Sequence, residues 1–368
     1  MAPLLNIAEI HGHISNRLDP STMAGKMVAG IIGDGPSHYS KSPALWNAAC
    51  AQLGMNAVYL PFDVDDAHVR DLLRLFRDSE QFIGVNVTVP HKVRVIDFLD
   101  DLDAGAARIH AVNTIVRNDN GRLIGYNTDG EGFIDSLLQP SPEQPQPFMR
   151  SLDGIDVLLL GAGGSARAVA FHVSDQIGQG RLIISNRTVA HGQSLADEIK
   201  KLGRNALAID EEGISTWAPK VGLIINSTTK GQGGIRKLNN GMATLLAPYS
   251  ALAPANPPAL SAELGDDFEA HWNEAARGDI EANQRHSETF AANIPSTTRF
   301  YDLIYHPEET VFLRHGRQTG HRTMNGKSMI VRQAVRAFRR ICQPQLARLG
   351  KDIDETFAQV TEVMSRAW

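Results

Sequence analysis

The chain has 368 residues and a mass of 40.1 kDa, a length that favours two domains of ordinary size. Its residues are 42% hydrophobic and 21% charged, which excludes disorder as the main state because there is enough apolar material for sizeable cores. The formal net charge of −5 argues against a protein that binds nucleic acid through its phosphates, or a membrane through a basic surface.

Targeting and covalent signals are sparse. The first 20 residues have neither the basic nor the apolar region of a secretory signal, so we expect a cytoplasmic protein. No stretch approaches the roughly 18 apolar residues of a membrane span. Cys50 and Cys342 have no C-x-x-C spacing, which favours two free thiols in a reduced compartment. The 13 histidines show no metal-ligand spacing, and we predict no metal site.

The first part of the chain alternates between apolar runs and amphipathic stretches. Runs that end in turn residues are predicted as strands, at 27–32, 57–64 and 84–89. Helices are predicted between and after them, at 42–53, 69–76, 90–98 and 129–138. Ser42 is expected to cap its helix, with Pro43 in the first turn. Residues 111–126 are predicted as a hairpin because Asn120-Gly121 is a favoured turn pair.

A second unit is predicted to begin after residues 139–147, where four prolines and three glutamines give the composition of a linker. Short apolar runs are predicted as further strands, at 157–160, 182–184, 223–225 and 300–304. The stretch 231–298 is irregular and then charged, which indicates either an insertion with its own helix or a flexible loop. Helices are predicted at 329–341 and within the tail, 343–368.

A glycine-rich turn follows the first of these later strands. Gly161, Gly163, Gly164, Ser165 and Ala166 fall within the pattern G-x-G-x-x-A, with a helix and another strand predicted after it. The first glycine suits the tight turn, the second admits a pyrophosphate, and the small third residue lets helix and strand pack closely. The pattern favours a dinucleotide site over a merely structural turn.

The end of the next strand bears on the choice of dinucleotide. An NAD enzyme usually has a carboxylate there for the ribose 2′-hydroxyl, but this chain has Asn186, Arg187 and Thr188. Arg187 would attract a 2′-phosphate and stack on adenine, and Thr188 would donate a hydrogen bond. The triplet favours NADP over NAD, the alternative being that Arg187 is only a solvated surface cation.

Eight motifs in collinear order resemble the shikimate dehydrogenase family, including its quinate/shikimate branch. They are S-x-S-P at 40–43, N-V-T-x-P-x-K at 86–92, A-x-N-T at 111–114, N-T-D-x-x-G-F at 127–133, the glycine turn, N-R-T at 186–188, Y-D-x-x-Y-x-P-x-x-T at 301–310, and the stretch 329–334. Each motif is weak alone, but the order of all eight is specific.

The resemblance implies an α/β protein. An N-terminal substrate-binding domain would span 26–138 and be completed by C-terminal helices at 326–368. A Rossmann-type NADP-binding domain would span 150–325, with an insertion at about 232–298, and the active site would lie in the cleft between the domains. The resemblance also implies a monomer or homodimer that acts on a small molecule in the chorismate pathway of aromatic amino acid biosynthesis.

The implied reaction is the NADP-linked interconversion of shikimate and 3-dehydroshikimate by hydride transfer. By similarity, Lys92 and Asp129 are the catalytic pair that handles the hydroxyl proton. Without the resemblance, Lys92 would read as a surface cation at a helix start, where the helix dipole disfavours it.

The remaining roles are also carried over by similarity. The substrate would be bound by Ser40, Ser42, Thr88, Asn113, Tyr305 and Gln333. Besides the glycine turn and the N-R-T triplet, the cofactor would be bound by Asn226, Ser227, Thr228 and Gly326. The structural alternatives are helix capping for Ser42 and a solvated polar face for Gln333.

One departure from the family pattern stands on the helix after Ser42. Trp46 takes the place of the usual histidine and is expected to pack in the core, although it could instead narrow the pocket. Two enzymatic alternatives stay open, a quinate dehydrogenase and a dehydrogenase of a modified shikimate. The alternative from another class is a non-catalytic relative that senses the metabolite, which predicts the loss of Lys92 or Asp129, and both residues are present.

Overall fold

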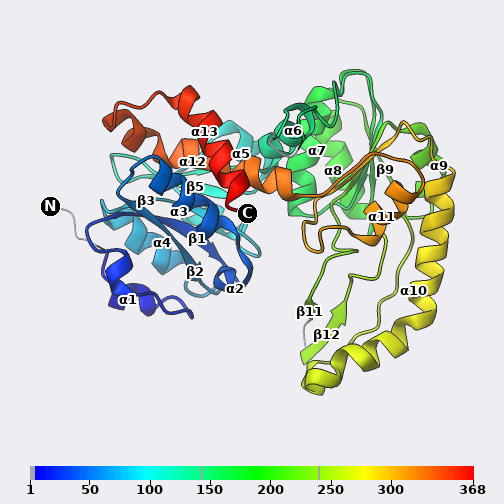
Figure 1. The fold of residues 1–368 in the computed structure, drawn as a ribbon, viewed down its shortest axis with the longest axis horizontal. Coiled ribbons are helices and arrows are strands. Elements are labelled where there is room, and N and C mark those ends of the chain that lie inside the picture. Colours follow the sequence, from blue (N-terminus) through cyan, green and yellow to red (C-terminus); the bar gives the residue numbers. More distant parts are fainter. Residues whose placement is uncertain (1–4, 142–143, 239–240) are drawn as a thin grey trace. The chain divides into compact units, whose positions relative to one another are not determined.

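The computed structural model describes residues 5–141, 144–238 and 241–368. Residues 142–143 of the predicted linker and 239–240 of the predicted insertion lie outside the described residues. The chain divides into two compact units, one formed by residues 1–147 and 328–368 and the other by residues 148–327 (Figure 1). None of the helices in the described ranges has the length and apolar character that a membrane span requires.

Unit 1 is built on a six-stranded sheet in the order β2-β1-β3-β5-β6-β4. Its strands are β1 (Met27–Gly33), β2 (Ala57–Asp63), β3 (Phe82–Val87), β4 (Asp101–Leu102), β5 (Thr114–Arg117) and β6 (Leu123–Tyr126). The first three are parallel, while β5 runs antiparallel to both β3 and β6. The third strand begins and ends two residues earlier than the sequence indicated.

Helices cover both faces of this sheet. They are α1 (Ile7–His11), α2 (Pro36–Tyr39), α3 (Ser42–Gln52), α4 (Val69–Asp78), α5 (Ala104–Ile109), α6 (Asp129–Leu138), α12 (Lys327–Arg348) and α13 (Ile353–Arg366), with 3-10 turns η1 (Pro20–Thr22) and η2 (Arg94–Phe98). Successive side chains of a strand point to opposite faces. Accordingly, Ile31 packs with α3, α12 and α13 in one core, while Ile32 packs with α4 in the other.

Two local predictions in unit 1 are wrong. Lys41 takes the N-cap position of α3 and Ser42 is the first helical residue, so the Ser42 side chain does not cap the helix. Pro90 does not begin a helix: a cis peptide bond precedes it, and the next regular element is the 3-10 turn η2. Lys92 therefore lies on a turn, where its carbonyl accepts a hydrogen bond of 2.7 Å from the backbone N–H of Val112.

Unit 2 is built on a second six-stranded sheet, in the order β15-β14-β10-β7-β8-β9. Its strands are β7 (Val157–Leu160), β8 (Leu182–Ser185), β9 (Ala206–Ile209), β10 (Leu223–Asn226), β14 (Arg299–Asp302) and β15 (Thr323–Met324), and every neighbouring pair is parallel. Read along the chain, this is the 3-2-1-4-5-6 order of a Rossmann fold. The accompanying helices are α7 (Gly164–Gln176), α8 (Val189–Lys201), α9 (Ile214–Trp217), η3 (Ala218–Lys220) and α11 (Val311–Gln318).

The long stretch after β10 forms an insertion with its own helix rather than a loop. Its elements are the antiparallel strands β11 (Ile235–Lys237), β12 (Met242–Leu245) and β13 (Leu260–Ser261), the 3-10 turn η5 (Ala262–Asp267) and the helix α10 (Phe268–Ala292). Figure 1 shows α10 in yellow, starting near β11 and β12. Tyr249, Phe268 and Trp272 are buried together there, and the Trp272 indole donates to the carbonyl of Pro258 at 2.8 Å. The insertion therefore has a small core of its own.

A buried carboxyl group lies at the carboxyl end of one strand of the Rossmann sheet. Asp302 ends β14 and is fully buried. Its Oδ1 accepts hydrogen bonds from Asn226 Nδ2 at 3.0 Å and from the backbone N–H of Ile304 at 2.9 Å, and its Oδ2 accepts one from the Thr310 hydroxyl at 2.7 Å. Burial raises the pKa of Asp302 to about 7, against the lowering effect of these hydrogen bonds. This carboxyl group ties β10 to both ends of the segment between β14 and α11.

The raised pKa of Asp302 makes the stability of the fold depend on pH. Between about pH 4 and about pH 7 the folded protein holds a proton on Asp302 that the unfolded chain has released. This stabilisation is therefore complete below the ordinary aspartate pKa of 3.8 and is lost as pH rises through the folded-state pKa of about 7. We expect the unfolding free energy of the wild type, measured in urea, to fall relative to that of Asp302→Asn as pH rises from about 4 to about 7. The change should be on the order of a few kcal/mol. Asp119→Asn is the control, because the Asp119 side chain is 82% exposed, and it should track the wild type. A difference that stays constant with pH would contradict the expectation.

Candidate functional site

The turn between β7 and α7 carries the predicted glycine motif. Gly161 has a φ of +108°, and an added Cβ would lie 2.7 Å from the Ser227 hydroxyl, so a larger residue is excluded. At Gly163 and Gly164 an added Cβ would meet nothing within 4 Å. Gly163 is also the N-cap of α7 and has no side chain to bond the first N–H groups. Open space and unpaired amide donors together fit the pyrophosphate of a dinucleotide.

The N-R-T triplet lies beside this turn. The backbone N–H of Gly161 donates to the carbonyl of Ser185 at 2.7 Å, which places the end of β8 next to the glycine turn. Asn186 holds the triplet in shape, because its Nδ2 donates to the carbonyl of Thr188 at 2.8 Å. Arg187 and Thr188 are exposed, so both side chains are accessible to a ligand. A 2′-phosphate on the adenosine half of a dinucleotide would find a cation and a hydroxyl here.

The other expected cofactor residues also belong to unit 2. Ser227 donates its hydroxyl to the carbonyl of Leu160 at 2.6 Å, and the Thr228 hydroxyl donates to Asn226 Oδ1 at 2.7 Å. The first bond holds the segment after β10 against the end of β7, and the second shapes the turn after β10. Gly326 has a packing reason to be glycine, because an added Cβ would lie 2.0 Å from the carbonyl oxygen of Leu303. Burial raises the pKa of Tyr305, which also lies in this unit.

In unit 1 the structure pairs the two predicted catalytic residues. Lys92 Nζ donates to Asp129 Oδ2 at 2.6 Å. The lysine side chain is 19% exposed and the aspartate side chain 8%, so the pair is largely screened from solvent but the ammonium group is the more accessible partner. Asp129 is the first residue of α6, where the helix dipole favours a negative charge. The arrangement therefore holds the Lys92 ammonium group at a fixed point, partly accessible to solvent.

Asn113 connects this pair to Gln333. Its Nδ2 donates to Asp129 Oδ1 at 2.8 Å and lies 3.3 Å from Gln333 Oε1, while its Oδ1 accepts from the backbone N–H of Thr128 at 2.9 Å. Gln333 reaches this position because α6 and α12 cross closely at Gly132, where an added Cβ would lie 2.6 Å from the Gln333 backbone nitrogen. The glycine of the N-T-D-x-x-G-F motif thus has a steric cause. Four predicted site residues meet here, although they are distant in sequence.

The predicted carboxylate-binding residues form a second group. The Ser40 hydroxyl accepts a hydrogen bond from the backbone N–H of Ser42 at 3.2 Å. Thr88 follows β3, and its methyl group lies where a side chain at Gly33 would have to go, 2.3 Å from an added Cβ. Ser42 is buried, whereas Ser40 and Thr88 are partly exposed. Near Ser42, a series of hydrogen bonds to the Lys92 group begins, through side chains to which the sequence assigned no role.

Those residues lie on the sheet. Tyr59 on β2 donates its hydroxyl to Asn86 Oδ1 on β3 at 2.7 Å, and the nearby Ser42 lowers the pKa of Tyr59, which burial raises. Asn86 Nδ2 donates to the hydroxyl of Thr114 on β5 at 3.0 Å. Asn86 and Thr114 belong to the quoted motifs, but the period of a strand does not say which buried polar side chains face one another. Thr128 of the N-T-D-x-x-G-F motif was likewise given no role, although it bonds both Asn113 and Gln333.

Trp46 packs in the core. Its side chain is 1% exposed, and its ring lies 4.6 Å from that of Tyr59 in a stacked arrangement and 5.1 Å from that of Phe338. Its indole Nε1 has no hydrogen-bond partner in the described part of the chain. Where the family pattern has a histidine, this chain therefore has an indole that packs against the ring of Tyr59.

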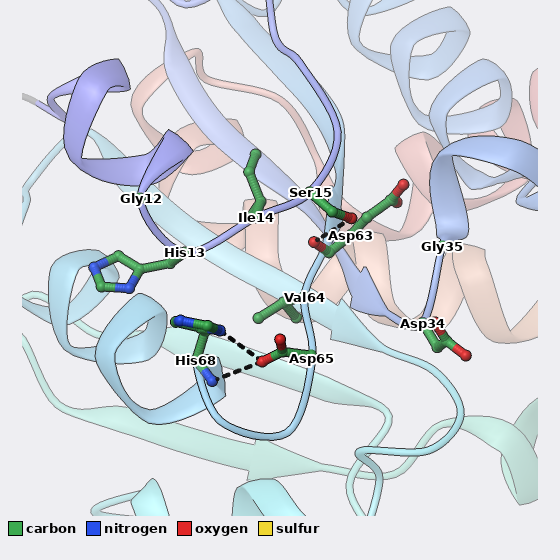
Figure 2. Close-up of a pocket in the computed structure, with 10 residues that line it drawn as sticks. All are labelled: Gly12, His13, Ile14, Ser15, Asp34, Gly35, Asp63, Val64, Asp65 and His68. Carbon is green, nitrogen blue, oxygen red and sulfur yellow. Dashed lines mark hydrogen bonds and ion pairs between the residues drawn. The ribbon is translucent and has the colours of Figure 1, made fainter.

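A separate cavity of about 240 Å³ opens elsewhere in unit 1. Figure 2 shows it between the segment after α1, the ends of β1 and β2, and His68, whose Nδ1 lies 2.6 Å from Asp65 Oδ1. None of the predicted site residues lines it, and its volume is below the roughly 300–1,000 Å³ of typical ligand pockets. Among the described residues, no group of three or more histidine, cysteine, aspartate or glutamate side chains is arranged to hold a metal ion.

Comparison with known proteins agrees with the motifs. Residues 31–115 match the family model of the shikimate dehydrogenase substrate-binding domain, and residues 145–244 match that of shikimate/quinate 5-dehydrogenase. The shikimate dehydrogenase (NADP⁺) of Desulforamulus reducens is 34% identical over 312 residues, which is 84% of this chain and 88% of that protein.

Solved structures share the fold. Shikimate 5-dehydrogenase from Thermus thermophilus in complex with NADP(H) and shikimate aligns with a TM-score of 0.63 at 26% identity, over 93% of this chain and 100% of that one. Quinate dehydrogenase from Corynebacterium glutamicum in complex with NAD aligns with a TM-score of 0.64 at 24% identity, over 90% and 98%. With an α/β unit, a Rossmann unit and relatives that cover most of its length, the chain belongs to the shikimate dehydrogenase family of NAD(P)-dependent oxidoreductases.

Proposed function

We propose that this chain interconverts shikimate and 3-dehydroshikimate with NADP as its cofactor. The observation that carries the proposal is the Lys92–Asp129 pair, 2.6 Å apart and joined by Asn113 to Gln333. A proton donor held among neutral hydrogen-bonding side chains suits a substrate that carries ring hydroxyls.

In the reductive direction, Lys92 is the proton donor. As negative charge develops on the carbonyl oxygen of the substrate, Lys92 Nζ transfers a proton to that oxygen and leaves a ring hydroxyl. Asp129 keeps Nζ in place through Oδ2, and Asn113 keeps Asp129 in place through Oδ1. Oxidation uses the same groups in reverse, so that the hydroxyl proton passes to Lys92.

The other predicted residues bind and orient the reactants. The hydroxyls of Ser40, Ser42 and Thr88, together with Tyr305, would hold the substrate carboxylate, and Asn113 and Gln333 would hold ring hydroxyls. The glycine turn would hold the pyrophosphate of NADP, with Asn226, Ser227, Thr228 and Gly326 along its nicotinamide half. Bound NADP⁺ would supply the hydride acceptor, and NADPH the hydride donor.

Exposure of Arg187 supports NADP over NAD, since the end of β8 offers a cation and no carboxylate. Quinate is the second substrate to be tested, because the fold is shared with a quinate dehydrogenase. A non-catalytic metabolite sensor is disfavoured, because such a protein has no need of an intact Lys92–Asp129 pair. Nicotinamide absorbance with shikimate and with quinate, each paired with NADP and with NAD, separates these cases. No reduction with any pair would overturn the enzymatic proposal.

Lys92→Ala should lower kcat about 10²- to 10⁴-fold, the range of general acid–base catalysis, because no proton donor then faces the reacting oxygen. Its dissociation constant for NADP, measured by calorimetry, should match that of the wild type, since Lys92 lies in the other unit from the glycine turn. Lys201→Ala, at the exposed end of α8, is the matched control and should keep full turnover. Substantial activity in Lys92→Ala would refute the assigned role.

Arg187→Ala should weaken NADP binding about 10- to 100-fold, as expected for the loss of a hydrogen bond to a charged group. Binding of NAD should change little, because NAD has no 2′-phosphate. Arg277→Ala on α10, which removes another exposed arginine of unit 2, controls for the loss of one positive charge. Equal weakening of both cofactors by Arg187→Ala would show that the residue does not recognise the 2′-phosphate.

A further inference from the structure

We propose that Tyr59 is a positioning residue: its hydroxyl begins a hydrogen-bond chain that ends at Asp129. The inference rests on the proposed function, since it concerns the same site. Tyr59 lies on β2 and does not belong to the motifs that mark the family in this sequence.

The first link of the chain starts at the phenol of Tyr59. The Tyr59 side chain is buried, and its hydroxyl lies 2.7 Å from Oδ1 of Asn86. Because an amide oxygen only accepts, the phenol must donate to Asn86. Burial raises the pKa of Tyr59, while the nearby Ser42 lowers it.

The remaining links continue in the same direction. Asn86 Nδ2 donates to the Thr114 hydroxyl at 3.0 Å, and that hydroxyl donates to Asn113 Oδ1 at 2.9 Å. Asn113 Nδ2 then donates to Asp129 Oδ1 at 2.8 Å, while Lys92 holds the other carboxylate oxygen. Every proton in the series points toward Asp129. Together with the hydrogen bond from the Thr128 N–H, the series helps to hold the Asn113 amide with its N–H toward the Asp129 carboxylate.

Tyr59 is itself held rigidly. Asn47 on α3 bonds its backbone twice, accepting from the Tyr59 N–H at 2.9 Å and donating to the Tyr59 carbonyl at 2.9 Å. Trp46, the preceding residue on α3, stacks on the phenol ring at 4.6 Å. Stacking on Trp46 thus restricts the movement of the phenol ring and of its hydroxyl. Removing that oxygen leaves Asn86 Oδ1 buried without its donor, which is costly enough to disturb the amide.

Tyr59→Phe tests the inference, because it removes one oxygen and keeps the ring that stacks on Trp46. We expect kcat with the preferred substrate to fall about tenfold, equivalent to ~1.4 kcal/mol, because Asn113 no longer orients Asp129 well. KM should change by less than about threefold, because the Ser42 hydroxyl remains available to the substrate. Tyr249→Phe, at a buried tyrosine of the insertion, is the matched control and should leave kcat unchanged.

A double-mutant cycle separates a chain of hydrogen bonds from a loss of stability. Thr114→Val breaks the same chain further along and should lower kcat by a similar factor, whereas Thr114→Ser, which keeps the hydroxyl, should restore it. The double variant Tyr59→Phe/Thr114→Val should be no slower than the slower single variant, because the chain is already broken. If Tyr59→Phe fails to fold, Thr114→Val and Thr114→Ser carry the same comparison.

The outcomes are distinct. The inference would be overturned, with the proposed function intact, if the kcat of Tyr59→Phe stayed within threefold of that of an active wild type. It would also be overturned if the kcat of the double variant fell about a hundredfold, the product of the two single losses. A lower melting temperature with unchanged kcat per folded enzyme would also overturn it, because a purely structural role gives that result. A wild type that turns over no substrate with either cofactor would instead overturn the proposed function, and the positioning role with it.

Discussion

The side-chain amide of Asn113 is the point on which the site in unit 1 depends. Its Nδ2 faces Asp129, Thr128 and Gln333, and its Oδ1 accepts from Thr128 and Thr114. Both ends of the amide are therefore used, and in a buried position an amide with its full set of partners cannot rotate without losing several of them. One side chain thereby connects β5, the start of α6 and the second turn of α12.

Much of the fold could be predicted because its strands are short, apolar and fully buried. Residues 157–160 and 223–225 carry that pattern, and both became central strands of the Rossmann sheet. The hairpin between β5 and β6 was predicted from the Asn120-Gly121 pair, but of these two residues only Gly121 has a positive φ, at +77°. Where the prediction failed, local propensity competed with tertiary structure: Pro90 suits a helix start but follows a cis peptide bond, and Ser42 suits an N-cap but lies one residue inside the helix.

The site was predictable as a set of motifs but not as a set of contacts. The resemblance predicted that Lys92 and Asp129 act as a pair, but the residues between them do not predict how far apart the two side chains lie. Tyr59 on β2 reads as an ordinary strand residue, because aromatic side chains are common in strands, and only the register between β2, β1 and β3 brings it near Asn86. The insertion was similarly ambiguous, since its core depends on Trp272 meeting β12, which lies far from it in sequence.

The discontinuity of unit 1 has a consequence for the order in which the protein can be made. After residue 147 has left the ribosome, the sheet of unit 1 is complete, but α12 and α13, which supply Phe338 and Met364 to one of its two cores, have not been synthesised. The intervening 180 residues, 148–327, take roughly 10 to 35 s at typical rates of translation. Unit 2, which is continuous in sequence, can fold in that interval. One apolar face of the unit 1 sheet stays uncovered until α12 and α13 are synthesised. Nascent chains of this protein should accordingly be exposed to chaperone binding and aggregation until α12, the helix that carries Gln333, has been synthesised.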